Sequence, residues 1–349
     1  MRIEYLLALL GAALGSMALL CALWIGRASG MLSFFSADAV FPAGAAFESV
    51  EDLRRVIAER DERDNRDGGD VSLRSILIPN PADLIIFELK PGLNIKFQSV
   101  PLRTNSFGLR GPEVEVRKPA GVYRIALLGD SFAFGWGVEE HNSFARVVER
   151  ELNRMLAGSK RVELMNFAVP GYSTFQEVAL FEEKGLKFDP DAVLVYVIEN
   201  DFGLPFFIKN LQGEEGLVPA AEFHKVKADE LSAEQQTKRS AILYALEANR
   251  ALVRLSQVAK QEGMRMFVSI NPNQHYKRVK DRLWALRSKR REQAAINFIP
   301  LRREYLARLE QKIVPEESLR LVGDPHPGPG GHQIVGTLLA ERLFPFVQK

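Results

Sequence analysis

From residue 121 onwards, short apolar runs alternate with longer amphipathic segments. Apolar runs bounded by turns predict strands, and apolar positions three or four residues apart predict helices. We expect strands at 123–128, 161–167, 192–198, 264–270 and 319–322. We expect helices at 144–155, 174–184, 242–261, 301–312 and 333–347. This alternation predicts a three-layer α/β/α fold with a central parallel sheet, and the near-continuous apolar strands fit a sheet that is covered on both faces.

The amino-terminal part of the chain has a different pattern. Residues 5–25 contain no charged side chain, and about 20 apolar helical residues cross the roughly 30 Å core of a bilayer. We therefore expect residues 1–30 to be an N-terminal membrane anchor. A cleavable signal peptide is the alternative, but its apolar region is usually shorter, and residues 28–30 are a poor candidate for the small-x-small cleavage site. A lipoprotein signal at Cys21 is disfavoured because Leu20 precedes it.

The orientation of this anchor is not fixed by charge, because Arg2 lies on one side of the apolar run and Arg27 on the other. We expect the rest of the chain outside the cytoplasm, because a single amino-terminal anchor on a bacterial-looking chain usually exports the domain attached to it. Residues 31–120 are expected to form a juxtamembrane and extended N-terminal region. It includes a charge-dense stretch, 51–70, and turns around Pro79, Pro91 and Gly108. Residues 121–349 then form the α/β domain.

Composition narrows the classes of function. The chain of 349 residues has a net charge of +2, which gives no argument for a nucleic-acid partner. Its single cysteine, Cys21, excludes an intramolecular disulfide and a cysteine metal cluster. The five histidines lack the paired spacing of metal ligands, and neither a P-loop nor a dinucleotide fingerprint is present. We expect no metal and no cofactor. The oligomeric state is left open.

Two short motifs carry the candidate chemistry. Gly129-Asp130-Ser131 directly follows the expected strand at 123–128, and Asp324-Pro325-His326 follows the expected strand at 319–322. Groups at the carboxyl ends of parallel strands meet at one edge of a sheet. A hydroxyl, an imidazole that takes its proton and a carboxylate that orients the imidazole are what serine nucleophilic catalysis requires. Ser131, His326 and Asp324 are therefore the candidate nucleophile, base and acid. His332, at the start of the last helix, is the competing base.

Two further strand ends supply candidate hydrogen-bond donors. Gly171 lies in the turn after the second expected strand, where its N–H can approach a bound carbonyl without a side chain in the way. Asn200 follows the third expected strand and can donate its side-chain amide. Together with the backbone N–H of Ser131 they are the expected oxyanion hole.

These residues resemble the SGNH hydrolase family, also called the GDSL esterase/lipase superfamily, whose Ser, Gly, Asn and His blocks look like Ser131, Gly171, Asn200 and His326. The resemblance covers about 121–349, and residues 105–111 resemble a segment of membrane-anchored bacterial members. Two positions depart from the family pattern. Ile198 replaces the Gly of the Gly-x-Asn-Asp block, and the last block reads Asp-x-His, as in polysaccharide-acetylation relatives.

The resemblance implies a membrane-anchored serine hydrolase that acts on carboxylic esters through an acyl-enzyme. We expect 121–349 to be its SGNH-type catalytic domain. The expected substrate is an acylated small molecule, glycan or lipid, with an O-acylated cell-envelope glycan preferred. An O-acyltransferase that modifies a polysaccharide is the first alternative. A lipid esterase and a catalytically silent envelope binding protein are the others.

Overall fold

The computed structural model of this protein describes residues 54–55, 57–58, 71–82, 84–202, 248–273, 275–286, 292 and 294–348. The chain divides into two compact units, Met1–Ala45 and Ala46–Lys349, and all described residues belong to the second. The expected membrane-spanning segment, 5–25, lies outside the described residues. The domain boundaries expected at residues 30 and 120 stay predictions.

A five-stranded parallel sheet forms the centre of this unit, in the order β6-β5-β7-β8-β9. The strands are β5 (Val122–Leu128), β6 (Arg161–Asn166), β7 (Ala192–Val197), β8 (Arg265–Ile270) and β9 (Ile296–Ile299). All six residues of β7 are buried, as are the last five of β5. Continuous burial of consecutive residues requires cover on both faces, because successive side chains point to opposite sides of a sheet.

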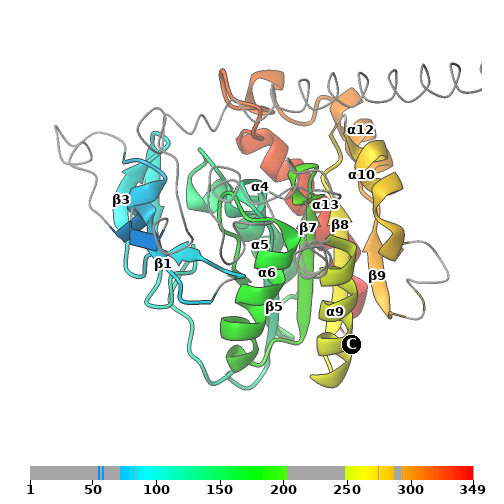
Figure 1. The fold of residues 1–349 in the computed structure, drawn as a ribbon. Coiled ribbons are helices and arrows are strands. Elements are labelled where there is room, and N and C mark those ends of the chain that lie inside the picture. Colours follow the sequence, from blue (N-terminus) through cyan, green and yellow to red (C-terminus); the bar gives the residue numbers. More distant parts are fainter. Residues whose placement is uncertain are drawn as a thin grey trace, which may run out of the picture. The chain divides into compact units, whose positions relative to one another are not determined.

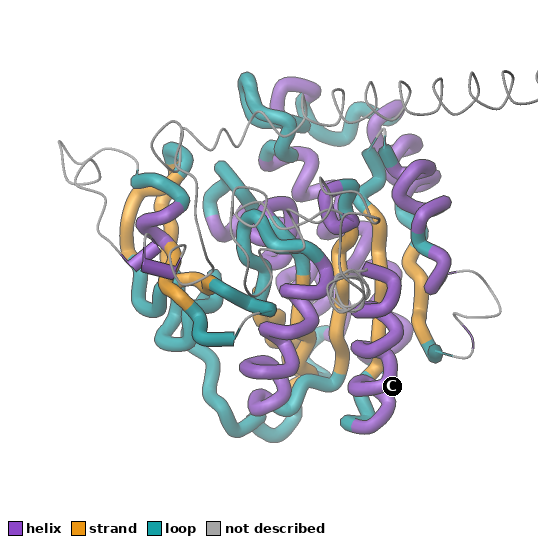
Figure 2. The backbone as a smooth tube through the Cα atoms, viewed as in Figure 1, coloured by secondary structure: helices purple, strands orange, loops and turns teal. Residues whose placement is uncertain are grey.

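Helices provide that cover (Figures 1 and 2). On one face lie α6 (Thr174–Leu180) and α9 (Ala248–Gln261), and on the other lie α5 (Phe144–Leu156) and α13 (Pro329–Val347). The other α-helices of the described residues are α4 (Ser131–Phe134), α10 (Tyr276–Arg282) and α12 (Arg302–Glu310). Single helical turns occur at Arg74–Ile76, Glu140–Asn142, Phe181–Gly185, Leu186–Phe188, Asn200–Phe202, Trp284–Leu286 and Glu316–Ser318. The expected three-layer α/β/α fold is confirmed. Residues 242–247 of the expected helix at 242–261 lie outside the described residues.

The contact between α5 and α13 depends on a small residue. A Cβ atom added at Gly336 of α13 would lie 2.5 Å from the Cβ atom of Val147 on α5, closer than any real contact. The helix also begins at Pro329, earlier than the expected start at 333. Proline suits the first turn of a helix because it has no N–H to leave unpaired there.

One expected strand is wrong. Residues 319–322 do not join the sheet, and their only ladder contact is an isolated antiparallel bridge between Arg320 and Pro327. Val322 is fully exposed, so this apolar run is not covered on two faces. The fifth strand is instead β9, which sequence reasoning missed because its four residues follow a strongly charged stretch. At the sheet edge, β9 needs burial of only part of its length, and Asn297 and Phe298 are half-buried.

Two small antiparallel hairpins precede the sheet. The first pairs β1 (Leu77–Pro79) with β2 (Phe87–Leu89), and the second pairs β3 (Asn94–Phe97) with β4 (Val100–Arg103). The first hairpin is fastened to the region around α6. The Phe87 carbonyl accepts a hydrogen bond from the Tyr172 hydroxyl, and the two rings pack edge to face with centroids 5.2 Å apart. The Gln176 amide also donates to the Ile85 carbonyl at 2.9 Å.

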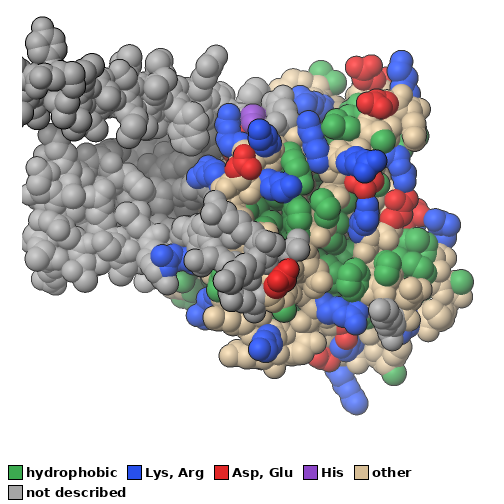
Figure 3. Space-filling view, turned by 90° about the vertical axis from the view of Figure 1, so that its right-hand side faces the viewer, with side chains coloured by type: hydrophobic (Ala, Val, Ile, Leu, Met, Phe, Trp, Pro, Cys, Tyr) green, Lys and Arg blue, Asp and Glu red, His purple; other side chains and the backbone are tan. Residues whose placement is uncertain are grey.

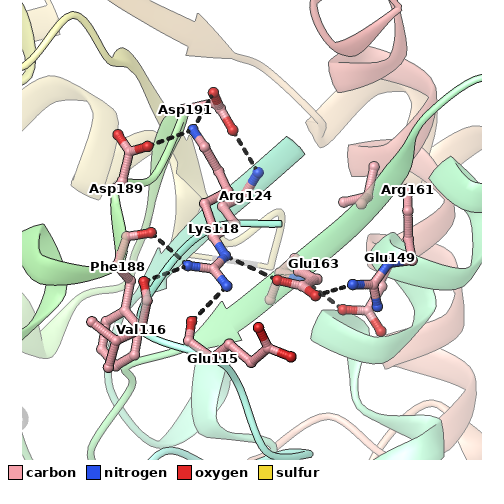
Figure 4. Close-up of polar contacts among 12 residues, drawn as sticks. Glu115, Val116, Lys118, Arg124, Glu149, Arg161, Glu163, Phe188, Asp189 and Asp191 are labelled. Atoms are coloured by element: carbon pink, nitrogen blue, oxygen red, sulfur yellow. Dashed lines mark hydrogen bonds and ion pairs between the residues drawn. The ribbon is translucent and has the colours of Figure 1, made fainter. Parts of the chain in front are cut away.

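A buried arginine ties the amino-terminal end of the sheet together (Figure 4). Arg124 of β5 is fully buried and pairs with Glu163 of β6 at 2.9 Å. Its guanidinium also donates to the backbone carbonyls of Glu115, Val116 and Phe188. This cluster lies at the opposite end of β5 from Ser131, so it bears on stability rather than on the candidate site.

Candidate active site

Ser131 lies at the turn between β5 and α4. Gly129 has a positive φ of 159°, and a Cβ atom there would lie 2.4 Å from the Cβ atom of Ala133. The chain can make this abrupt turn only with glycine at that position. Asp130 then caps the short helix by accepting a hydrogen bond from the Phe132 N–H at 3.0 Å. Ser131, the first helical residue, is 1% exposed.

The structure brings the Ser131 hydroxyl, His326 and Asp324 together. His326 Nε2 lies 2.8 Å from Ser131 Oγ, and His326 Nδ1 lies 2.5 Å from Asp324 Oδ1. The same Asp324 oxygen also accepts the backbone N–H of His326 at 2.8 Å. The carboxylate therefore orients both the main chain and the ring of His326, and leaves Nε2 facing the hydroxyl.

The charge state of Asp324 suits this role. Partial burial by itself raises the pKa of this carboxyl. The hydrogen bonds and positive charge of His326, with a smaller contribution from the nearby Trp136 side chain, outweigh burial and hold the pKa below its ordinary value. Asp324 is therefore ionised at neutral pH and can stabilise a protonated His326.

Aromatic rings enclose His326, which is itself buried. Trp136 stacks on the imidazole with centroids 5.3 Å apart and planes 19° from parallel. Phe132 packs against the ring at 4.8 Å. Neither aromatic residue was singled out from the sequence. The signal that could have identified them is their position in the sequence directly after Ser131, because side chains there lie at the same strand end.

Asn200 belongs to the turn Asn200–Phe202 after β7 and reaches the nucleophile turn. Its side-chain Nδ2 donates to Asp130 Oδ2 at 2.8 Å, and Ser131 Oγ lies 3.3 Å from the same oxygen. An amide nitrogen carries two hydrogens, so one remains for a substrate oxygen. Asp130 thus joins the candidate nucleophile to the candidate oxyanion donor, a role that its motif alone did not reveal.

Gly171 lies in the buried turn between β6 and α6, with a positive φ of 85°. The Val169 N–H of this turn donates to the Gly129 carbonyl at 3.2 Å, which places the two turns side by side. The structure thus gathers the strand ends that carry Ser131, Gly171 and Asn200 at the same edge of the sheet. Their roles as oxyanion donors stay predictions.

Two buried carboxyls lie behind these turns, and sequence reasoning did not single out either of them as a titrating group. Glu177 of α6 is 1% exposed, and Asp201 is also buried. Burial raises the pKa of both groups well above the ordinary value, and the nearby charge of Asp130 raises both further. Asp201 accepts the Ile198 N–H at 2.6 Å. Burial therefore favours the protonated form of both carboxyls.

His332, the competing histidine, lies elsewhere. Its Nδ1 accepts a hydrogen bond from the Phe144 N–H at 3.1 Å, and its ring stacks on Phe144. Burial, with the charges of Arg110 and His326, lowers the pKa of His332 to about 3. This neutral, buried imidazole connects α13 to the start of α5 and does not contact Ser131.

Within the described residues, no group of three or more His, Cys, Asp or Glu side chains is arranged to hold a metal ion. No helix in that part of the chain is long and apolar enough to cross a membrane.

Comparison with known proteins gives matches among solved structures alone, since no family model and no curated protein matches the chain. An acetyl xylan esterase has 16% identity and a TM-score of 0.41, over 63% of this chain and 99% of that chain. A protein named as a lipolytic protein of the G-D-S-L family, from Desulfitobacterium hafniense, has 14% identity and a TM-score of 0.36, over 62% and 98%. The esterase EstA from Pseudoalteromonas has 11% identity and a TM-score of 0.38, over 65% and 99%. At such values the likeness carries no argument about activity.

Proposed function

We propose that this chain is a membrane-anchored serine hydrolase of the SGNH type that cleaves carboxylic esters. One observation carries the proposal: His326 bridges the Ser131 hydroxyl and the Asp324 carboxylate, at 2.8 Å and 2.5 Å from its two ring nitrogens. A serine held in this way can lose its proton as it attacks, which a serine that only caps a helix cannot do.

The reaction proceeds through an acyl-enzyme. Ser131 Oγ attacks the acyl carbonyl carbon while His326 Nε2 takes the hydroxyl proton. The backbone N–H groups of Ser131 and Gly171 and the amide of Asn200 donate to the developing oxyanion. His326 then returns the proton to the alcohol oxygen as the C–O bond breaks. Water repeats the sequence on the acyl-enzyme and releases the carboxylic acid, so that no cofactor is required.

The preferred substrate is an O-acylated glycan of the cell envelope, with the catalytic domain on the outer side of the membrane. This part of the proposal rests on the apolar run at 5–25 and on the sequence resemblance. Cysteine labelling of the full chain in intact cells tests the sidedness. An introduced exposed cysteine, Ser159→Cys, is expected to react with a membrane-impermeant reagent. Reaction of this cysteine only after cell lysis contradicts the proposed location of the catalytic domain.

The activity is tested with p-nitrophenyl acetate and longer p-nitrophenyl esters, using the full chain in detergent. We expect His326→Ala to lower kcat by about 10²–10⁴-fold and Ser131→Ala to abolish both turnover and labelling by a fluorophosphonate probe. The exposed residues His141 and Ser159 give matched control variants, His141→Ala and Ser159→Ala, which retain activity. Equal activity in Ser131→Ala and in the parent protein contradicts the assigned site.

The same assay separates the alternatives. An O-acyltransferase uses the same three residues, and the Asp-x-His spacing of 324–326 favours it as the second candidate. Transfer of the acyl group to an added glycan, faster than release of free acid, identifies a transferase. Preference for long acyl chains identifies a lipid esterase, and failure of Ser131 to react with the probe in the folded protein identifies a silent binding protein.

A further inference from the structure

Arg110 is a buried cation that lies next to the nucleophile turn. It is 3% exposed, and burial lowers its pKa to about 10 despite the opposing charge of Glu140. Its guanidinium donates to the backbone carbonyls of Phe134 at 2.8 Å, of Gly135, and of Val138 at 2.6 Å. The guanidinium carbon also lies 4.7 Å above the Phe134 ring.

These carbonyls belong to residues 134–138, which comprise the last residue of the one-turn helix α4 and the loop after it. The last carbonyls of a helix have no partner within it, and their partial negative charge favours a cation. Arg110 supplies donors for three carbonyls at once from two nitrogens of a planar guanidinium, whereas a lysine would have to donate all three hydrogen bonds from a single nitrogen. The loop at 134–138 is therefore held from one side by a residue more than twenty positions earlier in the chain.

On its other side, the same loop contacts the candidate base and acid. Trp136, at its centre, is 7% exposed and stacks on His326. Its indole also lies close enough to Asp324 to contribute to the lowered pKa of that carboxyl. The next residue, Gly137, is packed so tightly that an added Cβ atom would lie 2.4 Å from Leu321 of the base-bearing loop.

We propose that Arg110 and Trp136 are positioning residues: Arg110 fixes the loop at 134–138, and Trp136 in turn holds the ring of His326 and the carboxylate of Asp324 in line with Ser131. The inference rests on the proposed ester hydrolase function. His326 and Asp324 lie outside regular secondary structure, so packing must set the orientation of the imidazole. A displacement of about 1 Å in such a group can lower turnover by about 10²-fold.

Kinetics of the full chain in detergent test this role with p-nitrophenyl acetate. Trp136→Ala removes both the stacking and the N–H, and we expect kcat to fall by about 10²-fold with KM little changed. Trp136→Phe restores a ring without the N–H, so its kcat should lie between those of Trp136→Ala and the parent. Arg110→Lys keeps the positive charge but not the planar arrangement of donors in the guanidinium. This variant should also lower kcat rather than raise KM.

A matched control separates positioning from general packing. Phe267 of β8 is also a buried aromatic residue, and it packs against Phe346 with centroids 5.0 Å apart, on α13. Phe267→Leu should lower the free energy of unfolding and leave kcat unchanged. If Phe267→Leu and Trp136→Ala lower kcat equally, the proposed positioning role is wrong.

A spectroscopic measurement decides the matter independently of activity. The short hydrogen bond between His326 Nδ1 and Asp324 should give a low-field proton NMR signal in the parent, identified by its absence in His326→Ala. We expect this signal to move upfield or broaden in Trp136→Ala, and to be unchanged in Phe267→Leu. An unchanged signal in Trp136→Ala overturns the inference. An inactive parent with an unlabelled Ser131 overturns the proposed function instead, while the signal still reports on Trp136.

Discussion

At the scale of single residues, the candidate site is a chain of hydrogen bonds with a carboxyl group at each end. Asp324 orients His326 from the base side, and Asp130 connects Ser131 to Asn200 from the other side. The two acids have opposite environments. Burial raises the pKa of Asp130 above its ordinary value, although hydrogen bonds from Asn200 and Phe132 oppose it. The His326 contacts lower the pKa of Asp324.

Asp324→Asn should lower kcat for ester hydrolysis by about 10²–10⁴-fold, because an amide cannot stabilise a protonated imidazole and can select the wrong tautomer. KM should change little, since Asp324 does not bind substrate. Steady-state kinetics measure both constants. Asp189→Asn is the matched control, because Asp189 is exposed and adopts a left-handed conformation that Asn also tolerates. Full activity in Asp324→Asn would exclude Asp324 as the triad acid.

Glu177 makes the free energy of unfolding depend on pH. Burial and the charges of Asp201 and Asp130 raise its pKa in the folded protein, whereas the unfolded chain releases this proton near the ordinary value of about 4.3. Above that value the folded state binds more protons than the unfolded state. The contribution of Glu177 to the free energy of unfolding is therefore largest at low pH and decreases as pH rises toward the raised pKa.

Glu177→Gln should flatten this dependence, because glutamine does not titrate. Urea unfolding at about pH 5 and about pH 8 measures the slope in the parent and the variant. Some slope remains, since the pKa of Asp201 is also raised. The exposed Glu262 gives the control variant Glu262→Gln, which should keep the parent slope. An identical slope in Glu177→Gln and the parent would mean that Glu177 is ionised in the folded protein.

At the scale of elements, the first four strands of the sheet were predictable from the sequence, and the edge strand β9 was not. The run at 192–198 is apolar throughout and the run at 123–128 is apolar apart from Arg124, and they become β7 and β5 at the centre of the sheet. At the edge, local hydrophobicity misleads in both directions. Residues 319–322 are apolar apart from Arg320 but form a loop, while β9 contains Asn297 and only two buried residues. Hydrophobicity reports burial, and pairing with β8 is a long-range property.

The sequence also indicated the candidate catalytic residues, but not the residues that pack around them. Ser131 and His326 were identifiable because their residue types and positions match a known chemistry. Trp136 and Arg110 carry no such pattern, since a tryptophan or an arginine is common in many contexts. Their contacts with His326 and with the carbonyls of 134–138 join segments that are distant in the chain, and one sequence does not specify such contacts.

The close approach of α5 and α13 allows a prediction at this scale. Gly336→Val places two methyl groups where Val147 already lies, and overpacking of this kind lowers the free energy of unfolding by about 1–3 kcal/mol. Chemical denaturation measures the loss. Thr337→Val, on the same helix, is the control for this effect. Gly263→Val is less suitable as a control, because Gly263 has a positive φ. Equal stability of Gly336→Val and the parent would show that the helices separate at little cost.

At the scale of the whole molecule, the two ends of the sheet have different tasks. The carboxyl ends of β5, β6 and β7 carry the candidate chemistry, while the amino-terminal ends of β5 and β6 carry the buried Arg124–Glu163 pair (Figure 4). The face in Figure 3 is mixed in charge, with Lys and Arg side chains interspersed with Asp and Glu around hydrophobic side chains. This agrees with the net charge of +2.

Arg124→Met tests this division. It leaves Glu163 without its buried partner and three carbonyls without their donor, so we expect the free energy of unfolding to fall by about 3–5 kcal/mol. At temperatures where the variant is folded, kcat should equal that of the parent. Arg161→Met is the matched control, because Arg161 is an exposed partner of the same Glu163, and its effect should be about 0–1 kcal/mol. A large loss of kcat in folded Arg124→Met would contradict the separation.

Asp324 contacts both the backbone N–H and the ring Nδ1 of His326. This arrangement has a consequence for how such a site is acquired. The acid and the base arrive as one local unit, because their geometry is set by residues two positions apart. Only one long-range distance, between His326 Nε2 and a hydroxyl 195 positions earlier, has to be met by the rest of the chain. The packing of Trp136 on the imidazole is the other contribution of the distant chain. The segment at 319–327, closed by its own bridge between Arg320 and Pro327, is in this sense a transplantable part. Grafted onto another parallel sheet, it would need a serine at a strand end and an aromatic ring against the imidazole.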